Sequence, residues 1–296
     1  MAIAARPGYR RYFDVNGWLF VGPAVALIGV FMAYPIAKSL WLSFHSGQGA
    51  VMKFAGLGNI DRLLNDPIFF TALTNTFIFL FVQVPIMIVL ALIMASCLNM
   101  PNLKFRGFLR TAVFLPCVTS LVAYSVLFKS MFSYDGLINS ILLKTGLVSE
   151  SVPWLSDPFW AKVVVIAAIT WRWTGYNMIF YLAAMQNIDK SIYEAARIDG
   201  ISATRRFLSI TVPMLKPVIL FTTVTSTIGT LQLFDEPMNI TQGLISDVTL
   251  TLSLYIFKLS FRYVPNFGYA ATVSYVIVVL VAILAFIQFY LARERD

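Results

Sequence analysis

Polar and charged side chains interrupt one of the long apolar runs of this 296-residue chain, at residues 171–177 (WRWTGYN). Arg172 lies near the middle of that run, where a charge costs at least about 2.5–3.5 kcal/mol in a membrane, so it should face a cavity or a partner. In a helix, Arg172 shares a face with Tyr176, and Trp173 shares the adjacent face with Asn177. An arginine between aromatic rings suits a sugar, because sugar hydroxyls need hydrogen-bond donors and sugar ring faces stack on aromatic rings.

A structural role for the same residues is the alternative. Arg172 would then bond helix carbonyls or Gln83 on a neighbouring helix, while the tryptophans fill grooves that face lipid.

A second polar set lies in the apolar run 217–240. Hydroxyl residues in membrane helices usually serve packing or join helices, which explains Thr222 and Thr223. Other members of the set are less easily explained in that way: Thr225, Ser226, Thr227, Thr230, Gln232, Asp235, Glu236 and Asn239. Gln232, Asp235 and Asn239 are spaced at three and four and could line one face of a pathway. Alternatively, Asp235 and Glu236 lie at the outer water interface.

The chain carries no sign of catalytic chemistry. It has no G-x-x-x-x-G-K-[ST] sequence to hold a nucleotide phosphate. Its one histidine, His45, and its two separated cysteines, Cys97 and Cys117, cannot form a catalytic triad or a metal site. We therefore expect that the chain is not an enzyme. If ATP drives its function, another subunit hydrolyses the ATP.

The composition is that of an all-α integral membrane protein. The chain is 59% hydrophobic and 12% charged, with a mean hydropathy of +0.78. Soluble domains are about half apolar and a quarter charged. Several apolar runs are long enough to cross about 30 Å of hydrocarbon as helices.

Basic residues flank these runs on one side, which predicts the topology. The amino-terminal segment 1–16 and the tail 293–296 should both be cytoplasmic, on either side of one transmembrane domain, 17–292. The outer segment 241–266 is partly apolar and should re-enter the membrane or pack on its outer side. Six spans are expected: 18–39, 70–98, 111–132, 159–185, 217–240 and 267–291.

The longest polar interruption, residues 189–215, should form a helical hairpin at a membrane face. Ser191 and Glu194 have the spacing of a capping box, and Gly200 suits the left-handed position at a helix end. Ser202 can cap a second short helix that ends near Ile210. Pro213, which follows, would stop or kink the chain. Such short helices need a docking surface. This surface is either the lipid headgroups or a partner protein.

Several motifs give this chain a family resemblance. Residues 194–196 (EAA), 199–200 (DG) and 210–213 (ITVP) resemble the EAA loop of ABC importer permeases, with Val212 where leucine is usual. Nearly the whole chain resembles the carbohydrate group of these permeases, which includes maltose, glycerol-phosphate and lactose systems, and lactose-type permeases are nearest. The further matching segments are 54–59, 75–76, 110–116, 184–188 and 234–235. Residues 241–244 depart from the family pattern because they lack a second glycine or a proline.

The resemblance implies a type I ABC importer permease fold, with six transmembrane helices and a cytoplasmic EAA coupling helix in the bacterial inner membrane. This chain would bind no cofactor; ATP and Mg would be held by the subunits of an ABC ATPase dimer. The other implied partners are a second, different permease subunit, a sugar-binding protein and the sugar. Coupling to the ATPase is expected to involve Glu194, Ala195, Ala196, Asp199, Gly200, Arg205 and Pro213.

The same resemblance implies sugar contacts in the fourth and fifth spans. With the candidates above, the expected substrate pathway comprises Arg172, Trp173, Tyr176, Asn177, Ser226, Thr230, Gln232 and Asp235.

An ion-coupled secondary carrier with six helices per unit is the competing class. It would need a carboxylate at mid-membrane depth, whereas Asp235 is expected towards the outer side. A membrane scaffold without transport activity would leave Arg172 unexplained.

Overall fold

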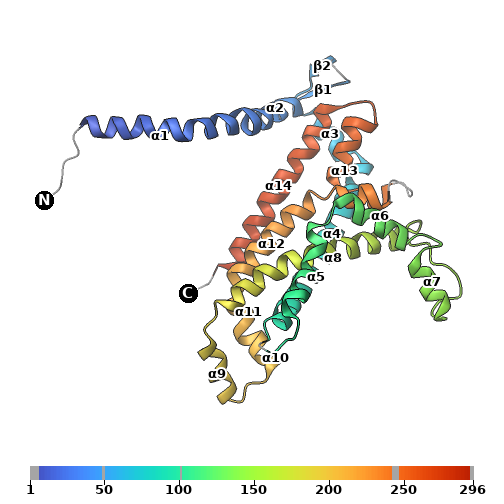
Figure 1. The fold of residues 1–296 in the computed structure, drawn as a ribbon. Coiled ribbons are helices and arrows are strands. Elements are labelled where there is room, and N and C mark those ends of the chain that lie inside the picture. Colours follow the sequence, from blue (N-terminus) through green and yellow to red (C-terminus); the bar gives the residue numbers. More distant parts are fainter. Residues whose placement is uncertain (1–6, 49–50, 101, 242–246, 294–296) are drawn as a thin grey trace. The chain divides into compact units, whose positions relative to one another are not determined.

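The computed structural model describes residues 7–48, 51–100, 102–241 and 247–293, and these residues are mostly helical (Figure 1). The chain divides into two compact units. The first comprises Met1–Asn65 and Leu259–Tyr275, and the second comprises Asp66–Lys258 and Val276–Asp296.

The first unit begins with one long helical run. Its elements are α1 (Pro7–Ile28), η1 (Gly29–Ala33), α2 (Tyr34–Ser43), β1 (His45–Gln48), β2 (Val51–Phe54), α3 (Gly58–Leu64), η5 (Lys258–Arg262) and the first turns of α14 (Phe267–Ala292). The antiparallel pair β1–β2 was not predicted and is the exception to an all-helical chain among the described residues.

Asn59, in the segment 54–59 that carries the family resemblance, fixes the turn after α2. Its side-chain amide donates to the backbone oxygens of Ser43 at 2.7 Å and His45 at 2.9 Å. At the start of α14, a Cβ on Gly268 would lie 1.8 Å from the His45 oxygen. The motif therefore fixes the end of α2, and the start of α14 packs closely against the same turn.

The second unit holds the remaining helices, with α4 packed along α8 at its centre (Figure 1). Its elements are α4 (Pro67–Leu98), α5 (Arg106–Val118), α6 (Leu121–Met131), α7 (Leu137–Lys144), α8 (Pro158–Gln186), α9 (Lys190–Ile198), α10 (Ala203–Arg206), η2 (Phe207–Thr211), α11 (Val212–Met214), α12 (Lys216–Leu231), η3 (Pro237–Thr241), η4 (Asp247–Thr249), α13 (Leu252–Phe257) and the rest of α14.

The two central helices begin in the same way. Asp66 and Asp157 each precede a proline, and each carboxylate accepts a backbone N–H two residues later at 2.9 Å. An aspartate cap followed by proline at the first helical position is a strong start signal.

The outer segment packs against the first turns of α4. The Asn75 amide donates to the backbone oxygens of Asp247 and Leu250, both at 3.0 Å, and the Thr76 hydroxyl accepts from the Leu252 N–H at 3.1 Å. Residues 242–246, which include most of the sequence that departs from the family pattern, lie outside the described residues.

Among the described residues, three helical segments are long and apolar enough to cross a membrane: Gly17–Ser43, Pro67–Leu98 and Phe267–Ala292. There are up to five if each of two bent pairs counts as one span. One of these bent pairs, α5 and α6, corresponds to the predicted third span. The two helices meet at 97°, so residues 111–132 do not form one straight helix. Helix α8 would be the sixth span by its length of 29 residues, so the number six stays a prediction.

Candidate functional site

The EAA hairpin, residues 189–215, is a well-defined helical pair. Helix α9 is capped by Asp189, whose carboxylate accepts the Ser191 N–H at 2.9 Å. That bond lowers the pKa of Asp189, so the cap is charged. The predicted cap at Ser191 is therefore wrong: the aspartate two residues earlier takes that role, and Glu194 is exposed on the second turn of the helix.

The end of α9 confirms the prediction for Gly200. This residue has φ +71°, its N–H donates to the Arg197 oxygen at 3.1 Å, and the Ile201 N–H donates to the Ala196 oxygen at 3.0 Å. These two bonds form a Schellman motif, in which the left-handed residue is usually glycine. The chain consequently reverses direction immediately after α9.

The second arm of the EAA hairpin starts at the predicted cap, since the Ser202 hydroxyl accepts the Arg205 N–H at 3.4 Å. It runs further than predicted: the helix continues through Pro213 to Met214, and a 71° bend separates it from α12. Pro213 is tolerated because it lies at the first turn of α11.

The two arms are held together by side chains. The hydroxyls of Tyr193 and Thr211 lie 3.0 Å apart, and the Arg206 guanidinium donates to the Ile201 oxygen at 2.8 Å. Ala196, in the first arm, is buried, at 4% exposure. The EAA hairpin is therefore a preformed unit.

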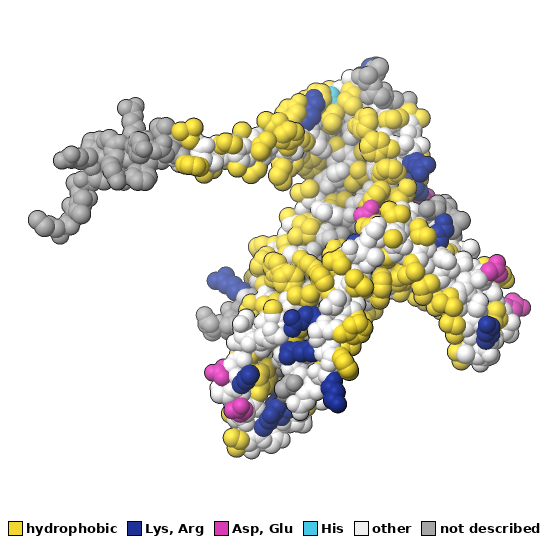
Figure 2. All heavy atoms as spheres, in the orientation of Figure 1, with side chains coloured by type: hydrophobic (Ala, Val, Ile, Leu, Met, Phe, Trp, Pro, Cys, Tyr) yellow, Lys and Arg dark blue, Asp and Glu magenta, His cyan; other side chains and the backbone are white. Residues whose placement is uncertain are grey.

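The hairpin presents most of its predicted coupling residues to the outside. Ile198, at 86% exposure, is an apolar side chain at the tip. Figure 2 shows Lys and Arg side chains gathered over the end of the second unit that carries the hairpin. Apart from the buried Ala196, the predicted coupling residues are all exposed: Glu194, Ala195, Asp199, Gly200, Arg205 and Pro213.

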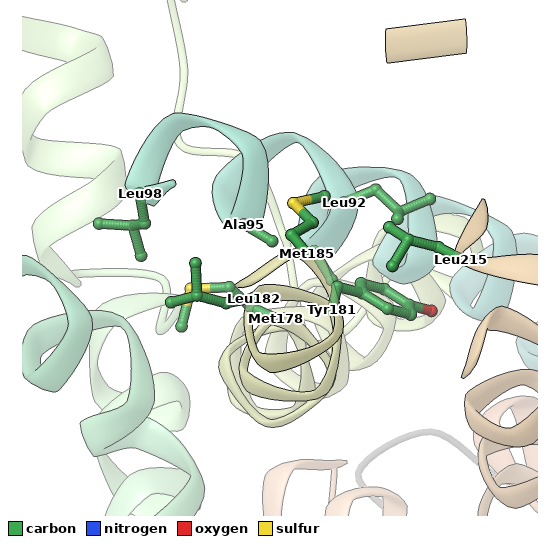
Figure 3. Close-up of a cluster of buried hydrophobic side chains, with 9 residues drawn as sticks. Leu92, Ala95, Leu98, Met178, Tyr181, Leu182, Met185 and Leu215 are labelled. Atoms are coloured by element: carbon green, nitrogen blue, oxygen red, sulfur yellow. The ribbon is translucent and has the colours of Figure 1, made fainter. Parts of the chain in front are cut away.

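The base of the hairpin is anchored in the core between α4 and α8 (Figure 3). Leu215, only 1% exposed, packs there with Leu92, Ala95 and Met185. Nearby, the Tyr181 and Thr222 hydroxyls lie 2.5 Å apart and join α8 to α12, which confirms the predicted joining role of Thr222. A force on the hairpin would thus reach three membrane helices.

Two of the predicted pathway residues belong to an exposed aromatic ladder. Ring centroids are 5.7 Å apart between Trp173 and Tyr176, 5.0 Å between Tyr176 and Phe180, and 5.7 Å between Phe180 and Phe221. Trp173 and Tyr176 are 36% and 38% exposed. The aromatic ladder (these four residues) runs along α8 and crosses to α12.

Arg172 and Asn177 point inward instead, with 8% and 2% exposure. Trp173 and Tyr176 therefore share the exposed face of α8. The sequence had predicted Arg172 beside Tyr176 and Trp173 beside Asn177. The Asn177 amide donates to the Trp173 oxygen at 3.1 Å.

Gln83 does not pair with Arg172 as the structural alternative supposed. Its side-chain oxygen accepts from the Thr230 hydroxyl at 3.4 Å, and that hydroxyl also donates to the Ser226 oxygen at 2.9 Å. Thr230 is thus buried with Gln83 between α4 and α12, while Ser226 is half-buried.

The prediction that Gln232, Asp235 and Asn239 share one face of a helix is wrong. Helix α12 ends at Leu231, so Gln232 is exposed, Asp235 is half-buried, and the Asn239 amide donates to the Asp235 oxygen at 2.8 Å. The alternative that places Glu236 at the outer water interface is wrong, because its side chain is only 4% exposed.

Among the described residues, no group of three or more His, Cys, Asp or Glu side chains is placed to bind a metal ion. The two cysteines within that part are both free thiols.

Known proteins resemble the chain over its whole length. The lactose transport system permease protein LacF of Rhizobium radiobacter is 65% identical over 297 residues, which is 100% of both chains. The arabinooligosaccharides transport system permease protein AraP of Halalkalibacterium halodurans is 33% identical over 93% of this chain and 86% of the relative.

A solved structure shares the fold. It is a chain of a bacterial ABC transporter involved in the import of alginate, with a TM-score of 0.82 and 23% identity, over 96% of this chain and 98% of that chain. Residues 68–296 match the family described as "Binding-protein-dependent transport system inner membrane component". The chain belongs to this family of ABC importer permeases, and it is a membrane-spanning transport subunit, not an enzyme.

Proposed function

We propose that this chain is one of two permease subunits of an importer that carries lactose or a closely similar disaccharide across the bacterial inner membrane. The 65% identity to a lactose permease along the full length of both chains is the observation that carries the proposal. The second permease is a different protein, and a sugar-binding protein delivers the substrate from outside.

The substrate pathway runs along the aromatic ladder. Exposed rings on neighbouring helices offer flat apolar surfaces for the ring faces of a sugar. Exposed Gln232 and half-buried Ser226 and Asp235 supply hydrogen-bond partners, while buried Arg172, Asn177 and Thr230 hold the helices that present the ladder. The second permease closes the other side of the pathway.

The EAA hairpin is the contact with the ATPase dimer, which holds ATP and Mg. Exposed Glu194 pairs with a basic residue of the ATPase, and exposed Ile198 enters an apolar part of the same cleft. The 29 residues of α8 span about 43 Å, more than the hydrocarbon core, so α7 and α9 lie on opposite sides of the membrane. With the hairpin inside and the predicted six spans, both termini are cytoplasmic.

The hairpin couples ATP to transport because its base belongs to the α4–α8 core. Closure of the ATPase dimer shifts the hairpin, and the anchored helices move with it to open the pathway outward. ATP and sugar must favour different states of this unit, since a ligand that binds both states equally shifts nothing. Family membership excludes the ion-coupled carrier.

The proposal predicts ATP-dependent uptake of lactose by proteoliposomes that contain the complete transporter and its binding protein. Changing Trp173→Ala should raise the lactose concentration for half-maximal uptake about fivefold to 150-fold, because one aromatic platform contributes roughly 1–3 kcal/mol. Uptake of radiolabelled lactose measures this.

Phe286→Ala is the matched control, because Phe286 is an exposed aromatic residue of α14 outside the ladder. It should leave lactose uptake unchanged. Uptake of an unrelated sugar in preference to lactose would contradict the proposed substrate, and uptake without ATP would contradict the proposed class.

A further inference from the structure

The ring of Tyr124 contacts the charged side chain in the middle of α8. Tyr124 is 2% exposed and lies in the first turn of α6, directly after the 97° bend between α5 and α6. The Arg172 guanidinium carbon lies over that ring, 4.7 Å from its centroid. A cation within about 6 Å of an aromatic centroid is attracted by the ring quadrupole, and the attraction is stronger where water is excluded. A cation–π contact therefore links the start of α6 to the middle of α8.

Arg172 also lies beside a second ring. Its guanidinium carbon is 5.7 Å from the centroid of Trp173. Nε and one terminal nitrogen of Arg172 are buried without a hydrogen-bond partner among the described residues. Hydrogen bonds consequently do not fix these two nitrogens, and the aromatic rings are the contacts that orient the guanidinium.

The ring of Tyr124 is itself held from several sides. The Phe128 ring meets it edge to face, with centroids 6.0 Å apart and an interplanar angle of 80°, and the Trp171 centroid lies at 6.3 Å. Tyr124, Ala168 and Ile240 belong to one buried cluster, so α6, α8 and η3 all pack here. Tyr124 is thus a rigid platform for the cation.

We infer that Tyr124 is a positioning residue of the transport pathway, which acts through Arg172 on Trp173. The Tyr124 ring orients the guanidinium, and the guanidinium in turn supports the ring of Trp173 at one end of the aromatic ladder. Side chains that bind a ligand need neighbours that lock their rotamers. The significance of the ladder rests on the proposed function, whereas the cation–π contact does not.

Fluorination makes this contact testable. Fluorine atoms withdraw electron density from a ring face and weaken its attraction for a cation, while the size of the ring changes little. The hydroxyl of Tyr124 has no hydrogen-bond partner among the described residues, so Tyr124→Phe serves as the reference. The mono-, di- and trifluoro derivatives of phenylalanine are then introduced at the same position by nonsense suppression.

Two quantities should follow the number of fluorine atoms. The melting temperature of the purified complex should fall stepwise from Tyr124→Phe to the trifluoro derivative. The lactose concentration for half-maximal uptake should rise over the series by about twofold to thirtyfold, the range expected for a cation–π contact that is partly or fully desolvated. Neither quantity should follow fluorination in an Arg172→Met background, where the cation is absent.

Phe128 provides a matched position for the same series. It is 9% exposed, lies one turn after Tyr124 in the same buried cluster, and packs on the rings of Phe132 and Trp171. Within the described part of the chain, no lysine or arginine lies over its ring. Fluorination of Phe128 should therefore give no stepwise trend. This comparison keeps the test decisive if Arg172→Met does not assemble.

A melting temperature that stays constant over the series at Tyr124, or that falls equally at Phe128 or in the Arg172→Met background, would overturn the inference. A stepwise fall with an unchanged half-maximal lactose concentration would also overturn it, because Tyr124 would then stabilise the fold without positioning Trp173. If the parent takes up no lactose, the proposed function fails, yet the melting temperatures still decide whether the cation–π contact exists.

Discussion

Changing Gly200→Pro should abolish ATP-driven sugar uptake and leave the protein in the membrane. Gly200 has φ +71° and donates its N–H to the Arg197 oxygen at 3.1 Å. Proline fixes φ near −65° and has no N–H, so the reversal after α9 cannot form. The anchored core at Leu215 lies at the base of the hairpin, so membrane insertion should persist. Uptake and the amount of permease in washed membranes are the two measurements.

Gly146 provides a matched control for this change. It ends α7 with φ +70° in the same Schellman motif: its N–H donates to the Leu143 oxygen at 3.1 Å, and the Leu147 N–H donates to the Leu142 oxygen at 3.0 Å. Gly146→Pro imposes the same local strain on the outer side of the membrane. It should retain a complex with the ATPase, whereas Gly200→Pro should lose it. Normal uptake by Gly200→Pro would contradict the coupling role of the hairpin.

Changing Gly175→Ala should destabilise the permease by about 1–3 kcal/mol, the usual cost of overpacking. A Cβ at this position would lie 2.0 Å from the Val113 oxygen and 3.0 Å from the Phe114 Cα, so the backbone of α5 would have to move away from α8. The displacement occurs beside the ladder residues Trp173 and Tyr176. Thermal unfolding of the purified complex and lactose uptake should both decline.

Gly229→Ala is the matched control, and its expected effect on stability has the opposite sign. Gly229 lies in α12 with nothing within 4 Å of an added Cβ. Alanine favours a helix over glycine by roughly 0.5–1 kcal/mol, so this variant should be as stable as the parent or more stable. If the two substitutions lower stability equally, close packing of α5 on α8 is not the cause of the loss in Gly175→Ala.

The features that were predicted correctly depend on local chemistry. Gly200 and Ser202 act within a few residues of their own positions, so the helix end and the second cap could be inferred from residue type and spacing. The cap of α9 was misassigned for an equally local reason. Asp189 and Ser191 are both good caps, and the sequence alone did not show which of them the helix uses.

The features that were missed depend on distant parts of the chain. Helix α12 ends at Leu231, and the Leu233 oxygen beyond it accepts a hydrogen bond from the Thr251 hydroxyl at the start of α13. This contact joins residues 18 positions apart. The burial of Glu236 likewise depends on packing against α6, which no periodicity in 217–240 could indicate.

The bend between α5 and α6 was missed for a different reason. The apolar run 111–132 continues through it without a charged residue before Lys129. Pro116 precedes the break by only a few residues, but proline also occurs inside the unbroken helix α4 at Pro85. The composition therefore indicates a membrane segment but does not reveal the bend between its two helices.

Site-specific crosslinking tests most directly whether the EAA hairpin docks on the ATPase. In a variant with Cys97 and Cys117 replaced by serine, Ile198→Cys places a thiol at a position that is 86% exposed, and Leu147→Cys places one at 73% exposure next to α7. With a short bifunctional thiol reagent and single-cysteine ATPase variants, we expect an ATPase adduct for Ile198→Cys and none for Leu147→Cys. An adduct at Leu147→Cys only, or no adduct at Ile198→Cys in a complex that transports sugar, would contradict this expectation.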